Sequence, residues 1–143
     1  MNRISFLLFA FVLSFGNLFA QNWNTSTPYA GRMNDLAFIT PKLGFACGQG
    51  AGIGNCTGSG LMLKTIDGGN TWVRMNTSTT NELTRVQFID PLSGWALGAS
   101  STVIHTVDGG MSWFTQTTGI GAGLRDMYFV NNNVGFICGL NGL

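Results

Sequence analysis

Short apolar runs alternate with polar, glycine-rich segments along most of the chain, as in Leu36–Ile39, Phe45–Gly48 and Leu61–Thr65. No stretch after the N-terminal region shows the 3.6-residue apolar spacing of an amphipathic helix, because glycine interrupts each one. Runs this short, bounded by turn-forming residues, predict β-strands joined by tight turns. The pattern therefore predicts an all-β fold.

The strand pattern repeats. DLAFITPKLGFACG, RVQFIDPLSGWALG and DMYFVNNNVGFICG, which start at Asp35, Arg85 and Asp126, align with one another. Phe88 and Phe129 lie 41 positions apart, and each later anchor of the second unit keeps this spacing in the third. The first unit is lengthened only in its glycine-rich loop. Independent anchors that share one period indicate an internal repeat.

Each complete unit predicts four strands, and a four-stranded unit repeated at about 40–50 residues is typical of a β-propeller blade. The units span residues 33–82, 83–123 and 124–143, the last of them incomplete. Gln21–Thr25 resembles an outer strand without its blade. We expect a partial β-propeller of four-stranded antiparallel blades, about two and a half of them plus this N-terminal outer strand. Since a closed ring needs roughly four to eight blades, we also expect a fragment of a longer protein. The predicted strands are Leu36–Ile39, Val86–Ile89 and Met127–Val130 (inner), Phe45–Gly48, Trp95–Gly98 and Phe136–Gly139 (second), Leu61–Thr65 and Val103–Thr106 (third), and Trp72–Met75 and Trp113–Gln116 (fourth).

The octets TIDGGNTW and TVDGGMSW fall between the predicted third and fourth strands. An Asp side chain accepts hydrogen bonds from nearby backbone N–H groups, and glycines adopt the positive φ angles of tight hairpins. A calcium loop would need more carboxylates than one per octet. A hydrolase would need two carboxylates that converge on one bond. A structural turn is therefore favoured over a metal or catalytic site, and packing is favoured over sugar binding for the tryptophans.

These octets resemble the Asp-box, or bacterial neuraminidase repeat, with the pattern Ser/Thr-x-Asp-x-Gly-x-Thr/Ser-Trp. The fuller pattern, RVQFIDPLSGWALG followed by VIHTVDGGMSW, is most similar to the photosystem II assembly and stability factor family. The resemblance implies a non-catalytic scaffold that holds protein partners, with an arginine-rich patch on one face. The matching positions are Thr65, Asp67, Gly69, Thr71 and Trp72, then Thr106, Asp108, Gly110, Ser112 and Trp113.

Five charged residues, Arg32, Asp35, Arg85, Arg125 and Asp126, lie at or just before the predicted inner strands. Loops that enter inner strands open near the central channel of a propeller, so these residues are candidates for a face that binds a protein partner. The alternative is that they are solvated loop charges.

The rival function is a piece of an extracellular glycoside hydrolase, sialidase-like or xyloglucanase-like, and its ligand would be a glycan. Asp35 and Asp126 are then the candidate acids, although a sialidase also needs an Arg-x-Pro motif, and Arg32 is not followed by Pro. His105 lies in a third strand, at a position expected to be on the surface, and has no evident partner for triad chemistry. We expect no enzyme activity in this segment.

Charge and cysteine content argue against nucleic-acid binding, binding to anionic membranes and metal binding. Residues 21–143 carry equal numbers of acidic and basic side chains, so no long-range field would attract nucleic acid or an anionic membrane. Cys47 and Cys56 could form a disulfide, which leaves Cys138 unpaired. Since no Cys/His set has zinc-ligand spacing, no metal or cofactor is expected.

Residues 1–20 have the layout of a secretory signal peptide: a basic start, an apolar centre and a small residue, Ala20, before Gln21. An N-terminal membrane anchor is the alternative, but the apolar stretch is short for a span and is interrupted by polar residues. We expect a secreted or periplasmic bacterial protein with no stable membrane span after cleavage.

Overall fold

The computed structural model describes residues 31–50, 60–119, 121 and 123–140, and the regular elements there are β-strands. In these ranges no helix is long and apolar enough to cross a membrane. The predicted signal peptide, the outer strand Gln21–Thr25 and Cys56 lie outside the described residues.

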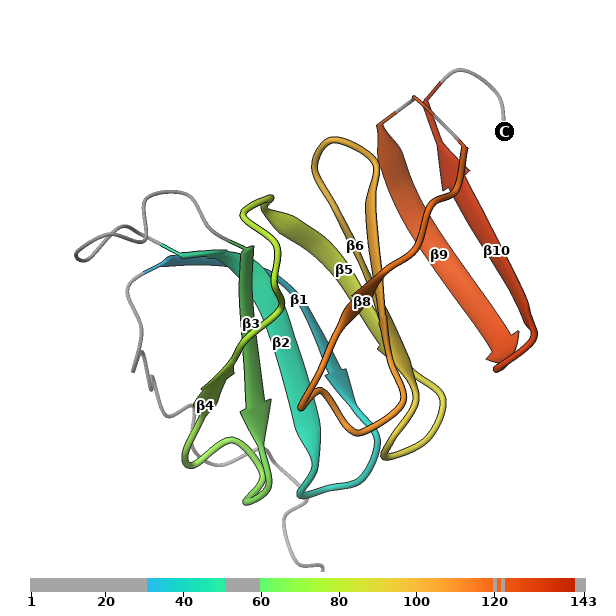
Figure 1. Cartoon of the computed structure of the whole chain (residues 1–143). Helices are drawn as coiled ribbons and strands as arrows, with labels where there is room; N and C mark the ends of the chain where they lie inside the picture. The colour runs from blue at the N-terminus through green and yellow to red at the C-terminus, as the bar shows by residue number, and fades with distance from the viewer. Residues whose placement is uncertain (1–30, 51–59, 120, 122, 141–143) are drawn as a thin grey trace, which may run out of the picture.

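The strands form three antiparallel sheets in which neighbours in the chain are neighbours in space. Figure 1 shows the sheets following one another in chain order, each one facing the next, as blades do in a propeller. The all-β partial propeller predicted from the sequence is therefore confirmed. The first sheet contains β1 (Gly31–Phe38), β2 (Gly44–Gly50), β3 (Gly60–Thr65) and β4 (Val73–Met75), the second contains β5 (Leu83–Phe88), β6 (Gly94–Gly98), β7 (Thr102–Thr106) and β8 (Phe114–Thr115), and the third contains β9 (Leu124–Asn131) and β10 (Val134–Gly139).

The inner strands are longer than the sequence predicted. β1 begins five residues before Leu36 and β9 begins three residues before Met127. The apolar pattern missed these polar starts, because a β-bulge lets the pairing of β1 with β2 continue past Met33. At this bulge a Cβ on Gly48 would lie 1.9 Å from the carbonyl oxygen of Arg32. The last glycine of the repeated motif is thus required by close backbone approach.

Aromatic stacks join successive sheets. Phe45 of β2 stacks on Phe88 of β5 with ring centroids 3.7 Å apart, and Trp95 of β6 stacks on Phe129 of β9 at 3.9 Å. A Cβ on Gly94 would lie 2.6 Å from the Phe88 ring, which explains the glycine that precedes each second-strand aromatic residue. The residues that repeat in the sequence therefore include those that stack between neighbouring blades, as well as those that form the strands.

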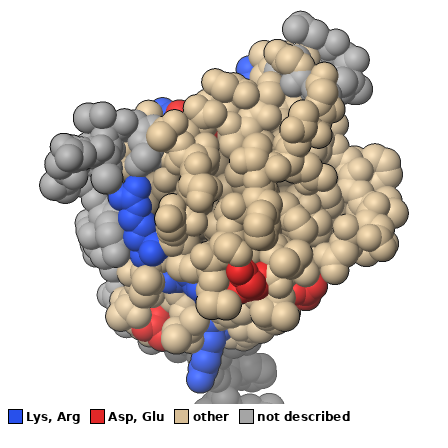
Figure 2. Space-filling model, viewed as in Figure 1, with Lys and Arg blue, Asp and Glu red and all other residues tan. Residues whose placement is uncertain are grey.

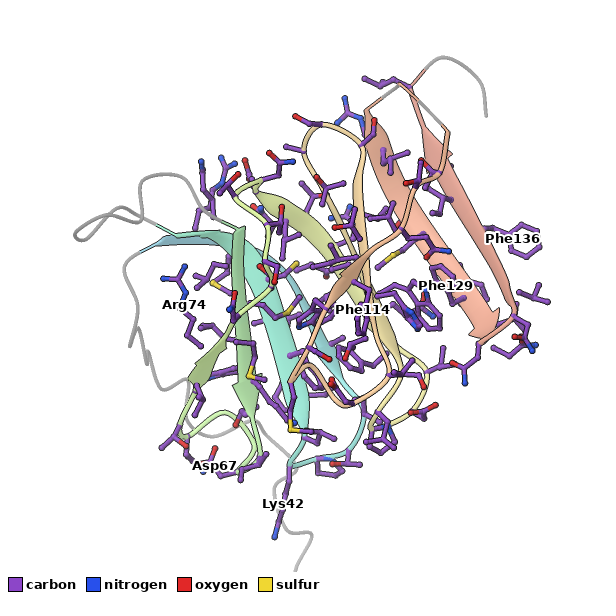
Figure 3. The ribbon with its side chains drawn as sticks, in the orientation of Figure 1. Lys42, Asp67, Arg74, Phe114, Phe129 and Phe136 are labelled. Carbon is purple, nitrogen blue, oxygen red and sulfur yellow. The ribbon has the colours of Figure 1, made fainter. Side chains whose placement is uncertain are left out.

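The first sheet and the third sheet leave apolar side chains exposed on the faces that turn away from the second sheet. Phe136 of β10 occupies the position that Phe45 and Trp95 occupy in the earlier sheets, yet it is 66% exposed. Figure 3 shows Phe136 on the outer side of β10, whereas Phe129 points toward the second sheet. Burial of the strand pattern thus depends on having a neighbouring sheet on both sides.

Candidate protein-binding face and the Asp-box turns

The candidate residues divide between the two ends of the sheets. β1, β5 and β9 begin at the upper end in Figure 1, whereas the turns that follow β3 and β7 lie at the lower end. Figure 3 places Asp67 and Lys42 at this lower end. The structure therefore separates the Asp-boxes from the charged residues predicted to bind a partner.

The first Asp-box is closed by hydrogen bonds within the turn. Oδ1 of Asp67 accepts hydrogen bonds from the Thr65 hydroxyl at 2.8 Å and from the Thr71 N–H at 2.9 Å, and Oδ2 accepts one from the Thr71 hydroxyl at 2.6 Å. The Thr65 hydroxyl oxygen in turn accepts the Gly69 N–H at 2.9 Å. Gly68 and Gly69 have φ angles of 75° and 91°, as the hairpin requires.

The second Asp-box repeats this geometry. Oδ1 of Asp108 accepts from the Thr106 hydroxyl at 2.8 Å and from the Ser112 N–H at 2.9 Å, while its Oδ2 accepts from the Ser112 hydroxyl. The hydroxyl bonds come first among the causes that lower the pKa of Asp67 and of Asp108 to about 2. Carboxylates that stay ionised and are already hydrogen-bonded within their own turn are suited to holding a hairpin closed, not to donating a proton.

The tryptophan of each Asp-box packs its ring against the inner-strand phenylalanine of its own sheet. Trp113 meets Phe88 edge to face at a centroid distance of 6.0 Å, and Trp72 meets Phe38 in the same way at 6.2 Å. Trp113 is buried, and its Nε1 has no hydrogen-bond partner among the described residues. A ring buried in this way presents no open face on which a sugar could stack.

At the opposite end, most of the predicted binding residues make contacts between neighbouring sheets. Arg32 pairs with Glu82 at 2.5 Å, and Asn34 donates to the same Glu82 oxygen at 2.8 Å. The bond from Arg32, followed by the one from Asn34, lowers the pKa of Glu82. Neither Asn34 nor Glu82 was identified from the sequence, since neither position matches in the aligned repeats.

Asp35 also joins the first sheet to the second. Its Oδ1 accepts the Leu36 N–H and its Oδ2 accepts the Val86 N–H, each at 2.9 Å. Arg85 and Asp126 form an ion pair at 3.3 Å between the second sheet and the third. The structure therefore brings Arg85 and Asp126 together, and both carboxylate oxygens of Asp35 accept backbone hydrogen bonds within the protein.

Gln87 is a further connection that sequence analysis missed. Its side-chain amide donates to the Phe129 carbonyl at 3.0 Å and accepts the Phe129 N–H at 2.8 Å. A side chain that satisfies both backbone groups of a residue in the next sheet fixes the register between two blades. An isolated glutamine in a strand gives no sequence signal for such a role.

Arg125 differs from the other four candidates. It is exposed, and no described residue forms a hydrogen bond or an ion pair with it. Its charge is therefore fully available at the end of the sheets where β9 begins.

Cys47 and His105 are both packed against neighbouring side chains or buried by them. Cys47 is fully buried; burial first, and then the negative charge of Asp35, raise the pKa of its thiol to about 12. Its predicted partner, Cys56, lies outside the described residues, so that disulfide stays a prediction. The expectation that His105 lies on the surface is wrong: it is half-buried, stacks on Trp95 at 4.6 Å, and burial lowers its pKa.

Charge on the molecular surface is sparse. The face in Figure 2 is largely uncharged, with Asp and Glu along its lower edge and Lys and Arg mainly at its left. Within the described ranges, no group of three or more His, Cys, Asp or Glu side chains could hold a metal ion.

The family model of the photosynthesis system II assembly factor YCF48 matches residues 16–114, which is more than half of the chain. The chain belongs to this family. No curated protein matches it significantly.

Two solved structures of YCF48 family proteins have the same fold. One is YCF48 bound to a D1 peptide, with 22% sequence identity and a TM-score of 0.65 over 81% of this chain and 38% of that one. The other is YCF48 from Cyanidioschyzon merolae, with 18% identity and a TM-score of 0.65 over 82% of this chain and 37% of that one. The chain thus spans less than two fifths of the length of these relatives.

Proposed function

We propose that this chain is part of an exported, non-catalytic propeller that binds a protein partner at the end of the sheets where the inner strands begin. The observation that carries the proposal is the position of Arg125, an exposed cation without an ionic partner in the described part of the chain. The peptide-bound YCF48 structure supports a peptide or protein as the partner class.

The surrounding contacts support a preorganised surface. The Arg32–Glu82 and Arg85–Asp126 pairs and the Asp35 bond to Val86 connect neighbouring sheets at this same end. Such contacts hold the strand ends in fixed relative positions, which lowers the entropy lost when a partner is bound. Arg125 then offers a cation to an acidic side chain or to a terminal carboxylate.

The non-catalytic part of the proposal rests on how the candidate acids are used. Asp35 accepts two backbone N–H groups, and Asp126 accepts the Met127 N–H at 3.0 Å while pairing with Arg85. A glycosidase acid needs a raised pKa and an open site, and its partner carboxylate must lie across the scissile bond. Export rests on the sequence of residues 1–20 alone.

The test is peptide binding by the full chain, measured by fluorescence anisotropy with acidic, neutral and basic peptides of equal length. We expect acidic peptides to bind best and Arg125→Ala to weaken that binding about fivefold or more, as for loss of a charge-assisted hydrogen bond. Lys42→Ala is the matched control, because Lys42 is an exposed cation at the opposite end.

Equal losses in the two variants would show that binding depends on net charge and not on this face. Absence of binding to every peptide class would refute the proposed function. A glycan-release assay completes the test: glycan turnover that Asp35→Asn or Asp126→Asn abolishes would establish the glycosidase alternative instead.

A further inference from the structure

The tip of the second Asp-box carries three exposed apolar side chains. Leu92, Val107 and Met111 are 57%, 56% and 73% exposed, respectively. They lie close together, because the Gly109 N–H donates to the Leu92 carbonyl at 2.8 Å, and Val107 and Met111 each lie two positions from Gly109 in the turn. A Cβ on Gly109 would also lie 3.9 Å from the Leu92 side chain. We call these three apolar side chains the tip patch.

The first Asp-box shows which of these positions the turn itself requires to be apolar. The matching positions of the first blade carry one cationic, one apolar and one amide side chain: Lys42, Ile66 and Asn70. Both turns have the same geometry, since the Gly68 N–H donates to the Lys42 carbonyl at 3.0 Å, as the Gly109 N–H does to the Leu92 carbonyl. The turn therefore accepts a polar side chain at two of the three positions, and folding does not require the tip patch.

The exposure of the tip patch follows from its place at the ends of the strands and not from packing between sheets. Lys42, Ile66 and Asn70 are exposed as well, although the four-stranded second sheet lies beside the first. In Figure 1 these turns lie beyond the lower ends of the strands. A complete neighbouring blade therefore leaves the tip of an Asp-box open.

The turns that carry the tip patch are held in place before any partner binds. Lys64 of the first sheet donates from Nζ to the Gly109 carbonyl at 2.9 Å. In the neighbouring turn, Oδ1 of Asp90 accepts the Leu92 N–H at 2.7 Å. A backbone that is already fixed loses little entropy on binding, while the unbranched side chain of Met111 can adapt to the shape of an apolar group.

The charges at the tip determine which partner chemistry fits the patch. Asp90 and Asp108 lie in the two turns that carry the tip patch, and neither turn contains Lys or Arg. Lys64 approaches from the first sheet, but its amino group is held by a backbone carbonyl of the turn. Figure 2 shows acidic side chains along this lower edge of the molecule. An apolar patch bordered by carboxylates attracts an apolar group that stands next to a cation, and it repels an anionic lipid surface.

We propose that the tip patch is a docking site for a protein segment in which an apolar side chain stands next to a Lys or Arg. The apolar side chain packs on Leu92 and Met111, and the cation lies beside the carboxylates of Asp90 and Asp108. This site lies at the opposite end of the sheets from Arg125, so a partner bound here leaves the face of the proposed function free.

The methionine methyl resonances of the full chain test the proposal directly, because Met111 belongs to the patch. The probe is a synthetic peptide of repeated Leu-Ser-Lys units, and two altered peptides carry Glu in place of Lys or Ser in place of Leu. We expect the Leu-Ser-Lys peptide to shift the Met111 resonance in a saturable way. Each altered peptide is expected to bind about tenfold more weakly or worse, because one loses the charge attraction and the other loses the apolar contact.

The first blade supplies protein variants that are compatible with the turn. Leu92→Lys and Met111→Asn install the side chains found at the matching positions of the first blade, and the double variant is expected to weaken binding of the Leu-Ser-Lys peptide about tenfold or more in fluorescence anisotropy. Ile66→Asn is the matched control, because it removes an exposed apolar side chain from the tip of the first turn. Ile66→Asn and Arg125→Ala are each expected to keep the affinity within about twofold. Thermal unfolding checks that the double variant folds, and the altered peptides test the site in the unchanged protein.

Several results would overturn the proposal. A Met111 resonance that no peptide shifts, or that the Glu-bearing peptide shifts equally well, would exclude a basic apolar segment as the partner. Equal losses of affinity in Ile66→Asn and in the double variant would mean that the peptide binds any apolar tip, and a loss in Arg125→Ala would place the peptide on the face of the proposed function. Co-sedimentation of the full chain with phosphatidylglycerol vesicles, lost in the double variant, would assign the tip patch to a membrane instead.

Discussion

The Thr106→Val variant tests whether the Asp-box is held closed by its own hydrogen bonds. Thr106 is fully buried, and its hydroxyl oxygen accepts the buried Gly110 N–H at 2.9 Å while its proton goes to Asp108. Valine has nearly the same shape and the same branching at Cβ, so the change removes the hydroxyl group and leaves no large cavity. The variant therefore isolates the hydrogen bonds from the packing.

The expected loss of unfolding free energy depends on which hydrogen-bond partners remain for the Gly110 N–H and for the Asp108 carboxylate. The Gly110 N–H loses its acceptor in a buried position, and an unsatisfied buried donor costs about 1–3 kcal/mol. The carboxylate of Asp108 loses the hydrogen bond from the Thr106 hydroxyl, but it keeps two donors from Ser112 and is open to water. The loss of that one bond therefore adds little to the cost. We expect the free energy of unfolding of Thr106→Val to fall by about 1–3 kcal/mol in total.

Urea unfolding followed by tryptophan fluorescence measures this difference, because Trp113 is buried next to the turn. Thr115→Val is the matched control: the same substitution at an exposed position of β8 is expected to change the free energy by no more than about 0.5 kcal/mol. Thr65→Val should show a loss like that of Thr106→Val, since the first box has the same bonds.

The reasoning would be refuted if Thr106→Val and Thr115→Val were equally stable. That result would mean that the hairpin is fixed by packing of its tryptophan and by glycine conformation alone. The hydroxyl in the Asp-box pattern would then need another explanation, such as a role during folding.

Three further predictions concern pH, backbone approach and contacts between sheets. The pKa values of Asp67 and Asp108 are lowered to about 2, so the stabilisation that these carboxylates provide is complete above the ordinary pKa near 3.8 and is lost as the pH falls toward 2. The double variant with Asn at both positions should therefore show a flatter dependence of stability on pH between those two values, measured by thermal unfolding. An unchanged pH dependence would contradict this role of the two carboxylates. Gly98→Ala places a Cβ 2.4 Å from the Glu82 carbonyl oxygen and should cost about 1–3 kcal/mol or more in urea unfolding, whereas wild-type stability would mean that the bulge shifts freely. Gln87→Leu should cost about 1–3 kcal/mol, because two backbone groups of the third sheet lose their partner. Arg85→Gln breaks an exposed ion pair and one hydrogen bond to the adjacent Thr84 carbonyl, and it should cost less than about 1 kcal/mol. The reverse order of the two losses in calorimetry would contradict the role assigned to Gln87.

Much of the blade architecture could be predicted because it depends on local chemistry that recurs. The octets required a tight turn wherever they occurred, and the turn was found after β3 and after β7. The strand starts could not be predicted, because the pairing of Arg32 with Gln49 depends on a bulge and not on apolar character. The candidate face was only partly predictable for the same reason: Asn34, Glu82 and Gln87 act through neighbours in space, and Asn34 contacts a residue 48 positions away.

By itself, the sequence determined the repeat, the strand order within each blade and the chemistry of the Asp-box, since each depends on residues close together in the chain. Tertiary structure alone decided which charges are available. It engaged Asp35 with Val86 and Arg85 with Asp126, left Arg125 without an ionic partner in the described ranges, and placed His105 on Trp95. The physical reason is that a hydrogen bond or an ion pair between blades depends on where the next sheet places its backbone, and only the packed structure fixes that position.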